Sequence, residues 1–198
     1  MVALEGSVVA ISGGNGGAAR VIADALVREG AEVITNGADV DQKSVERLVD
    51  SAVERFGRLD VLVLDAGDVD ETGPVAELDD AGWQRVLDRN LNHVFWGIRR
   101  GLTHMLPRGD GRIIVTSSIE AKLPRAGASS YVAASHAVNG LVKSVAHEVG
   151  PSGVKVNAIL ARPDNLQQVA SVAVLLASPS ITSITGCMFP ADSGATPY

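Results

Sequence analysis

The sequence is poor in cysteine, aromatic residues and positive charge, and each shortage excludes a class of protein. The one cysteine, Cys187, cannot form a disulfide within the chain, and no cysteine–histidine cluster has metal-ligand spacing. Lysine and arginine total 17 against 23 acidic residues, a net charge of −6, which argues against nucleic acid and anionic membranes as partners. No apolar stretch is long enough to span a bilayer, and the acidic N-terminus does not resemble a signal peptide. We therefore expect a disulfide-free cytoplasmic protein without a metal site.

Short β-branched segments alternate with longer segments whose apolar residues have helical spacing. Strands are expected at 7–12, 31–35, 59–67, 111–118, 154–160 and 187–192. Helices are expected at 18–30, 41–57, 81–106, 130–150 and 166–179. This alternation, with nearly continuous apolar strands, predicts a parallel sheet covered on both faces. Because there are no repeats or linkers, residues 1–198 are interpreted as one α/β domain, a three-layer, doubly wound, Rossmann-like sheet.

A glycine-rich turn, SGGNGGAA (12–19), joins the first expected strand to the first expected helix. Glycine permits positive φ and lets backbone amides approach a diphosphate at a helix N-terminus. A tight strand-to-helix turn that needs glycine for its shape alone is the alternative. The position of the turn after the first strand of an α/β chain favours nucleotide binding.

Two motifs suggest a family. Ser12, Gly13 and Gly17 follow the pattern Thr-Gly-x-x-x-Gly-x-Gly, with alanine in place of the last glycine. Ser118 precedes Tyr131 by thirteen residues, and Tyr131 stands at the start of an expected helix. With these motifs the chain resembles the short-chain dehydrogenase/reductase family nearly from end to end. The resemblance implies a Rossmann-like fold and an NAD(P) cofactor.

The resemblance also assigns cofactor-binding positions. The segment ADV (38–40) corresponds to one whose acidic residue, here Asp39, lies beside the adenine. The family's Asn-Asn-Ala-Gly strand end corresponds to VLVLDAG (61–67), in which leucine and Asp65 replace the two asparagines. By resemblance, the cofactor-binding residues are Ser12, Gly13, Gly17, Asp39, Ala66 and Gly67.

The catalytic residues of the family correspond to Ser118, Tyr131 and Asn90. The resemblance implies that Tyr131 is the general acid/base, that Ser118 polarises a carbonyl, and that Asn90 anchors a proton-relay water. In SYVAASHAV (130–138), however, Ser135 stands where the family has a lysine that lowers the pKa of the tyrosine. An unperturbed tyrosine has a pKa of about 10. We therefore expect Tyr131 to be a neutral phenol, which can donate a proton but is a poor base.

Two pieces of the family fold are missing from the sequence. AEVIT (31–35) runs directly into NGADV (36–40), whereas a strand–helix–strand crossover needs a dozen or more residues. We expect the third strand and its preceding helix to be absent, with family strand order 2-1-4-5-6-7. Only PDN (163–165) precedes the last helix, so the substrate-covering loop is also absent. Ala161 and Arg162 replace a Pro-Gly pair that in the family meets the nicotinamide.

Five cofactor-linked positions therefore depart from the family pattern: Ala19, Asp65, Ser135, Ala161 and Arg162. Asp65 is the most informative, because a carboxylate near the cofactor groove would oppose the phosphates. Together these changes predict that NAD(P) binds weakly or not at all.

Four further residues are candidates for contact with substrate. Glu120 lies two residues after Ser118 and is either a general base or a solvated loop carboxylate. Arg125 and Arg162 could hold an anionic substrate, although arginines are common on surfaces. His93, one turn after Asn90, could face the same cavity or pack between helices.

Three functions are compatible with these residues. The favoured one is non-redox acid/base chemistry on a carbonyl-containing small molecule, such as dehydration, isomerisation or cyclisation, using Ser118 and Tyr131. The first alternative is an NAD(P)-dependent short-chain oxidoreductase with an atypical site, and the second is a catalytically silent homologue that acts as a partner subunit. By analogy with the family, the helices at 81–106 and 130–150 are expected to form a homodimer or homotetramer.

Overall fold

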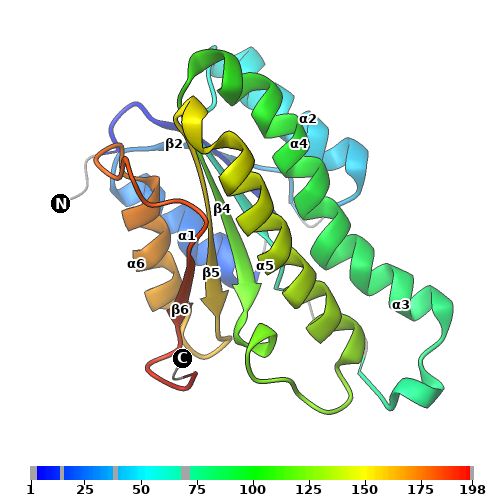
Figure 1. Ribbon diagram of the computed structural model, residues 1–198. Helices are drawn as coiled ribbons and strands as arrows, with labels where there is room; N and C mark the ends of the chain where they lie inside the picture. Colours follow the sequence, from blue (N-terminus) through cyan, green and yellow to red (C-terminus); the bar gives the residue numbers. More distant parts are fainter. Residues whose placement is uncertain (1–3, 14–15, 38–39, 68–71, 197–198) are drawn as a thin grey trace.

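The core of the molecule is a six-stranded parallel sheet in a computed structural model that describes residues 4–13, 16–37, 40–67 and 72–196. The strands are β1 (Val8–Ser12), β2 (Glu32–Thr35), β3 (Val61–Asp65), β4 (Gly111–Ser118), β5 (Val154–Ala161) and β6 (Met188–Ala191). Their order is β2-β1-β3-β4-β5-β6, and every neighbouring pair is parallel (Figure 1). This order confirms the predicted sheet without the family's third strand, and it leaves β2 at one edge.

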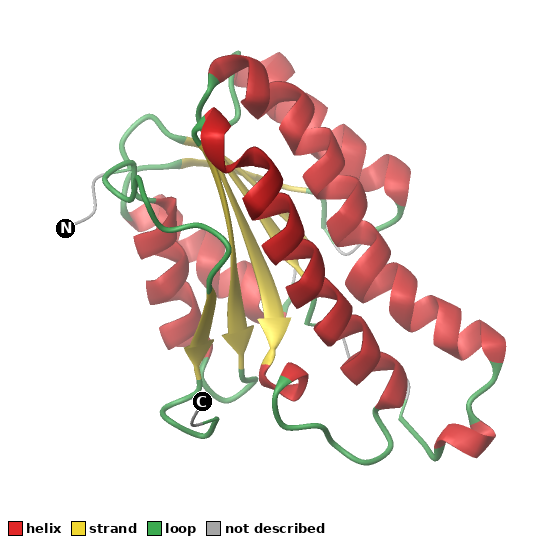
Figure 2. Ribbon diagram, viewed as in Figure 1, coloured by secondary structure: helices red, strands yellow, loops and turns green. Residues whose placement is uncertain are grey.

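Helices cover both faces of the sheet, as expected for a doubly wound fold (Figure 2). They are α1 (Gly17–Arg28), α2 (Gln42–Phe56), α3 (Asp80–Leu87), α4 (His93–Met105), α5 (Ser129–Val149) and α6 (Leu166–Ala177). Short 3₁₀ turns lie at Val75–Glu77, Leu106–Arg108, Ile119–Ala121 and Gly150–Ser152. None of the helices in the described part of the chain is long and apolar enough to cross a membrane.

Two apolar cores lie on opposite faces of the sheet because side chains alternate along each strand. Leu62 and Leu64 of β3 pack with α2, α4 and α5 on one face. Val61 and Val63 of the same strand pack with α1 and α6 on the other. β3 is therefore apolar on both sides, which explains its continuous apolar run in the sequence.

The bounds of α2 follow from local chemistry. The Asp41 carboxylate accepts a hydrogen bond from the Ser44 amide at 3.0 Å and caps the start of the helix. Gly57 ends it with a φ of +73°, a left-handed conformation that glycine adopts without steric cost. Both signals are visible in the sequence, so the expected helix at 41–57 is confirmed.

The expected single helix at 81–106 is interrupted, which corrects the sequence prediction. A π-helical turn at Asp88–Asn92 separates α3 from α4. Within it, the buried Asn90 side chain donates to the Val86 carbonyl at 3.0 Å. The turn packs against α5. A π-helical turn contains one more residue than an α-helical turn. Because helix continues on both sides of it, the apolar spacing changes too little for the sequence to reveal the turn.

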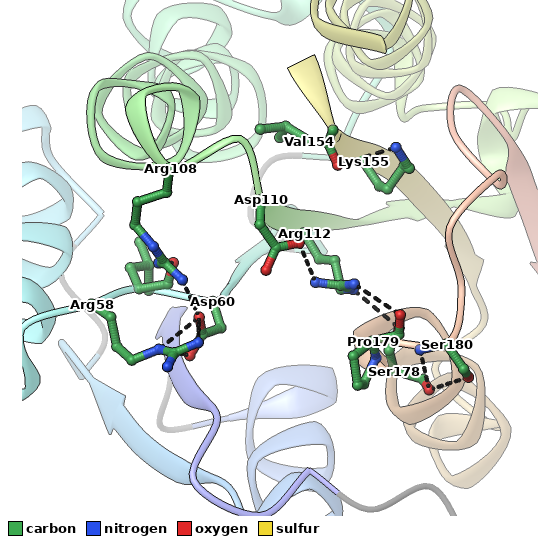
Figure 3. A network of polar contacts seen from close by, with 12 residues as sticks. Arg58, Asp60, Arg108, Asp110, Arg112, Val154, Lys155, Ser178, Pro179 and Ser180 are labelled. Carbon is green, nitrogen blue, oxygen red and sulfur yellow. Dashed lines mark hydrogen bonds and ion pairs between the residues drawn. The ribbon is translucent and has the colours of Figure 1, made fainter. Parts of the chain in front are cut away.

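Charged residues form a network at the amino-terminal ends of the strands (Figure 3). The nearly buried carboxylate of Asp60, just before β3, accepts from the Val8 amide at 2.9 Å. It also pairs with Arg58 and Arg108, each at 2.8 Å. Burial by itself would raise the pKa of Asp60, but hydrogen bonds from Arg58, the Val8 amide and Arg108 hold it below its ordinary value. This network fastens β1, β3 and the end of α4 together.

Candidate active site

A cleft of about 1130 Å³ opens at the carboxyl-terminal ends of the strands. It lies where β1 and β3 are neighbours and successive connections turn to opposite sides, the position at which open α/β sheets bind ligands. Its walls come from the glycine turn, the ends of β3 and β4, the start of α5 and the short connection from β5 to α6. The cleft therefore gathers segments from the whole length of the chain.

Two glycines of the turn, on either side of residues 14–15, have backbone conformations that favour glycine. Gly13 and Gly17 have φ values of +78° and +51°, which favour glycine. The Gly13 amide donates to Asn36 Oδ1 at 3.2 Å, and Asn36 Nδ2 donates to Ser44 Oγ at 3.1 Å, so the turn is tied to α2. A Cβ added at Gly16 or Gly17 would meet nothing within 4 Å. The surface above the turn is therefore open to a ligand.

Asp65 joins the end of β3 to the start of α1. Its Oδ2 accepts the Ala19 amide at 3.0 Å, and its Oδ1 accepts from the Thr116 hydroxyl. That hydroxyl in turn accepts from the Ala66 amide at 3.2 Å. Asp65 also lines the cleft. The carboxylate is therefore part of the local structure as well as a charge beside the groove.

Tyr131 and Ser118 meet in the cleft, as the family motif implies. Tyr131 is only 4% exposed, and burial raises the pKa of its phenol to about 12. A hydrogen bond from Ser118 lowers the pKa, whereas the negative charges of Glu120 and Asp65 raise it. Tyr131 is therefore a neutral phenol at neutral pH.

Ser135 does not take over the role of a lysine. It is buried one helical turn from Tyr131, and its hydroxyl lowers the pKa of the phenol. It does so without a hydrogen bond of ordinary geometry to any described residue. No positive charge is among the main influences on the Tyr131 pKa, so only the hydroxyls of Ser118 and Ser135 oppose the effect of burial among these influences.

The charged residues proposed to contact substrate are paired within the chain. Arg125 Nε lies 3.0 Å from Glu120 Oε1, and the Glu120 amide donates to Ser118 Oγ at 3.1 Å. Arg162 binds both oxygens of Asp164, at 2.9 and 2.7 Å. All four charged residues line the cleft. A substrate anion would have to displace Glu120 or Asp164 to bind either arginine with the same geometry.

His93 and Asn90 are buried and do not belong to the lining of the cleft. Burial lowers the pKa of His93 to about 4, although the nearby Arg89 carbonyl favours protonation. Neither ring nitrogen makes a hydrogen bond of ordinary geometry to a described residue. The structure thus places His93 in the packing between helices, the alternative that the sequence left open.

The residues assigned to a cofactor divide into two groups. Gly13, Gly17 and Gly67 line the cleft. The side chains of Ser12 and Ala66 are buried outside its lining. Asp39 lies outside the described residues.

Sequence reasoning missed Thr116 and the apolar wall of the cleft. Thr116 is paired in register with Asp65 on the neighbouring strand, so the strand alignment could have identified it. Ile119, Leu123 and Leu166 form part of the apolar lining. Isolated apolar residues in connections carry no periodic signal, which is why their convergence was not predicted.

Comparisons with known proteins agree with this geometry. A family model described as short chain dehydrogenase matches residues 3–163. The chain is 37% identical to 3beta-hydroxysteroid dehydrogenase 2 of Eggerthella lenta over 141 residues, which are 71% of this chain but only 53% of that protein. It is 29% identical to cyclohexanol dehydrogenase of an Acinetobacter species, covering 99% of this chain and 88% of that protein.

A solved structure, levodione reductase, superimposes with a TM-score of 0.89 at 27% identity, covering 97% of this chain and 98% of that chain. The alignment with cyclohexanol dehydrogenase extends over 220 positions, more than the 198 residues present here. That relative therefore contains segments that this chain lacks, in agreement with the shortened fold.

Proposed function

The chain belongs to the short-chain dehydrogenase family, and from this premise we propose that it is an NAD(P)-dependent oxidoreductase that reduces a carbonyl group of an alicyclic small molecule. The relatives are dehydrogenases, which favours oxidoreductase chemistry over the non-redox reaction that the sequence first suggested. The observation that carries the proposal is the buried, neutral phenol of Tyr131 beside Ser118 in the cleft.

The protonation state of Tyr131 sets the direction of the reaction. When a carbonyl is reduced, its oxygen needs a proton, and a neutral phenol donates one. Oxidation of an alcohol instead needs a phenolate to accept the proton. With a pKa of about 12, roughly one phenol in 10⁵ is ionised at pH 7. The site therefore favours reduction over oxidation, and Ser118 would polarise the carbonyl.

A dinucleotide fits the glycine-turn side of the cleft. The open surface over Gly16 and Gly17, together with Gly67, would hold it through backbone amides. When bound, it would supply the hydride. Among the described residues of this wall, Asp65 opposes a diphosphate, because its carboxylate faces the start of α1.

The wall formed by Ile119, Leu123 and Leu166 supports an apolar substrate. The names of the two curated relatives point to alicyclic alcohols, a steroid and cyclohexanol. A cyclic ketone would place its ring against this wall and its oxygen between Ser118 and Tyr131. The short β5–α6 connection leaves the entrance of the cleft accessible.

The direct test follows NADH and NADPH consumption with cyclohexanone, and the reverse reaction with cyclohexanol and the oxidised cofactors. We expect reduction to be the faster reaction at pH 7 and Tyr131→Phe to lower its turnover by about 10²- to 10⁴-fold. Turnover in Tyr131→Phe equal to that of the wild type, or oxidation as fast as reduction, would contradict the proposed role of the phenol.

A second function, cofactor-independent acid/base chemistry by Ser118 and Tyr131, is favoured by one observation. The Asp65 carboxylate occupies an amide at the start of α1, where a diphosphate would otherwise be attracted. Calorimetric titration separates the two functions. Absence of NADH and NADPH binding at millimolar concentration would favour the second, and binding of either nucleotide would favour reduction.

A further inference from the structure

Asp65 carries a negative charge at the point where the cleft meets α1. It is the last residue of β3, and Gly13 at the end of β1 is so close that a Cβ added there would lie 3.3 Å from the Asp65 Cβ. Its Oδ2 accepts the amide of Ala19, the third residue of α1, at 3.0 Å. Because Asp65 also lines the cleft, a ligand that approaches the start of α1 meets this carboxylate.

The start of α1 has no other capping side chain in the described part of the chain. Its N-cap residue is Gly16, and the first turn contains no acidic residue. A helix N-terminus carries a partial positive charge and free amides, which attract anions such as phosphate. Asp65 accepts a hydrogen bond from one of these amides and offsets the partial positive charge, although it lies 46 residues further along the sequence.

The two hydrogen bonds of Asp65 to the Ala19 amide and the Thr116 hydroxyl can form without a negative charge. An asparagine could accept the Ala19 amide with its Oδ1 and donate from its amide nitrogen to the Thr116 hydroxyl. That hydroxyl would still accept from the Ala66 amide, as it does now at 3.2 Å, while its own proton would turn to another acceptor. Asparagine therefore keeps these two neighbours and removes the negative charge, which separates the charge from the two contacts.

We propose that Asp65 is a specificity-determining residue that selects against ligands carrying a diphosphate beside α1 and thereby limits the affinity for NADH and NADPH. The inference rests on the proposed function, since it assumes that the dinucleotide occupies this wall of the cleft. It extends that function because it attributes weak binding of the cofactor to the charge of Asp65 and not to a change in the shape of the cleft.

The test compares Asp65→Asn with the wild type by calorimetric titration of NADH, ADP and adenosine. Removal of the charge should tighten binding of NADH and ADP by at least about tenfold, or 1.4 kcal/mol. Adenosine, which has no phosphate, should bind equally to both proteins. Asp24→Asn is the matched control, because it makes the same charge change on an exposed residue of α1 and should leave all three affinities unchanged.

Each other outcome has a separate meaning. Equal NADH affinity in wild type and Asp65→Asn would overturn the role of the charge and leave the proposed reductase intact. Failure of NADH to bind either protein would overturn both. A gain for adenosine as large as for ADP would assign the effect to local rearrangement and also overturn the inference. If Asp65→Asn does not fold, Asp65→Ser repeats the test with another neutral side chain.

Discussion

Buried polar side chains are paired differently at the two ends of the sheet. At the amino-terminal ends of the strands, Asp60 is nearly buried and is held by two arginines and a backbone amide (Figure 3). At the carboxyl-terminal ends, among the described residues, the hydroxyls of Ser117 and Ser135 and one oxygen of Glu120 are buried without a hydrogen-bond partner. Buried polar groups are normally satisfied, so the groups at the second end are available to a bound ligand.

This difference separates stability from function within one fold. The amino-terminal network joins strands and helix ends, and its loss is expected to reduce the free energy of unfolding. The carboxyl-terminal cleft lies where nucleotide-binding folds bind their ligands, and the main charges that act on the Tyr131 pKa there are the negative charges of Glu120 and Asp65. Substitutions at the two ends should therefore have different consequences.

The largest effect is expected at Asp60. Asp60→Ala leaves two arginines and the Val8 amide without their acceptor, and we expect a loss of about 4 kcal/mol in the free energy of unfolding. Asp110 is the control, because its carboxylate is half exposed and pairs only with Arg112 in the described network, at 3.1 Å. Asp110→Ala should cost less than about 1 kcal/mol in urea denaturation. Similar losses for the two variants would remove the special role of Asp60.

His93 should make stability depend on pH. The pKa of His93 in the folded chain, about 4, lies below the ordinary 6.5. Between these two pH values, His93 is therefore protonated in the unfolded chain and neutral in the folded chain. The contribution of neutral His93 to the free energy of unfolding is fully present above pH 6.5. About 3 kcal/mol of it is lost as the pH falls to 4. Urea denaturation of His93→Leu should lack this component of the pH dependence, whereas the same substitution at the exposed His136 should retain it. An unchanged profile in His93→Leu would show that other groups cause the dependence.

A positive charge placed beside the phenol should lower the pKa of Tyr131, the opposite of the effect of burial. Ser135→Lys is expected to lower the pKa of Tyr131 from about 12 to between about 9 and 11, because a nearby cation favours the phenolate. The chain has two tyrosines, so a Tyr198→Phe background lets tyrosinate absorbance report Tyr131 alone. Ser144→Lys, on an exposed position of the same helix, should leave the titration unchanged. An unshifted titration in Ser135→Lys would show that the lysine does not reach the phenol.

The smallest effect is expected at the start of α2. Asp41→Ala removes the acceptor for the Ser44 amide and should cost about 1 kcal/mol in the free energy of unfolding. The neighbouring Gln42→Ala removes only an exposed contact with Glu46 and should cost less than half as much. Thermal denaturation of the two variants measures the difference, and equal midpoints would argue against the cap.

Much of the fold follows from local features of the sequence. Apolar periodicity locates the strands and helices, and Asp41 and Gly57 mark the ends of α2. The absence of a third strand follows from the few residues between β2 and α2, which cannot contain a crossover. The pairing of Ser118 with Tyr131 follows from a motif, because their spacing is characteristic of a known arrangement.

The rest depends on contacts between distant segments. The π-helical turn and the burial of His93 have no signature in local spacing. The bond from the Ala19 amide to Asp65 joins residues 46 positions apart. Periodicity and chain length were enough to establish the order of the elements and the shortened sheet, since both depend on neighbouring residues. Whether each charge is paired, buried or open to a ligand was decided only when the strands brought their carboxyl ends to one cleft, because pKa and affinity depend on distance in space.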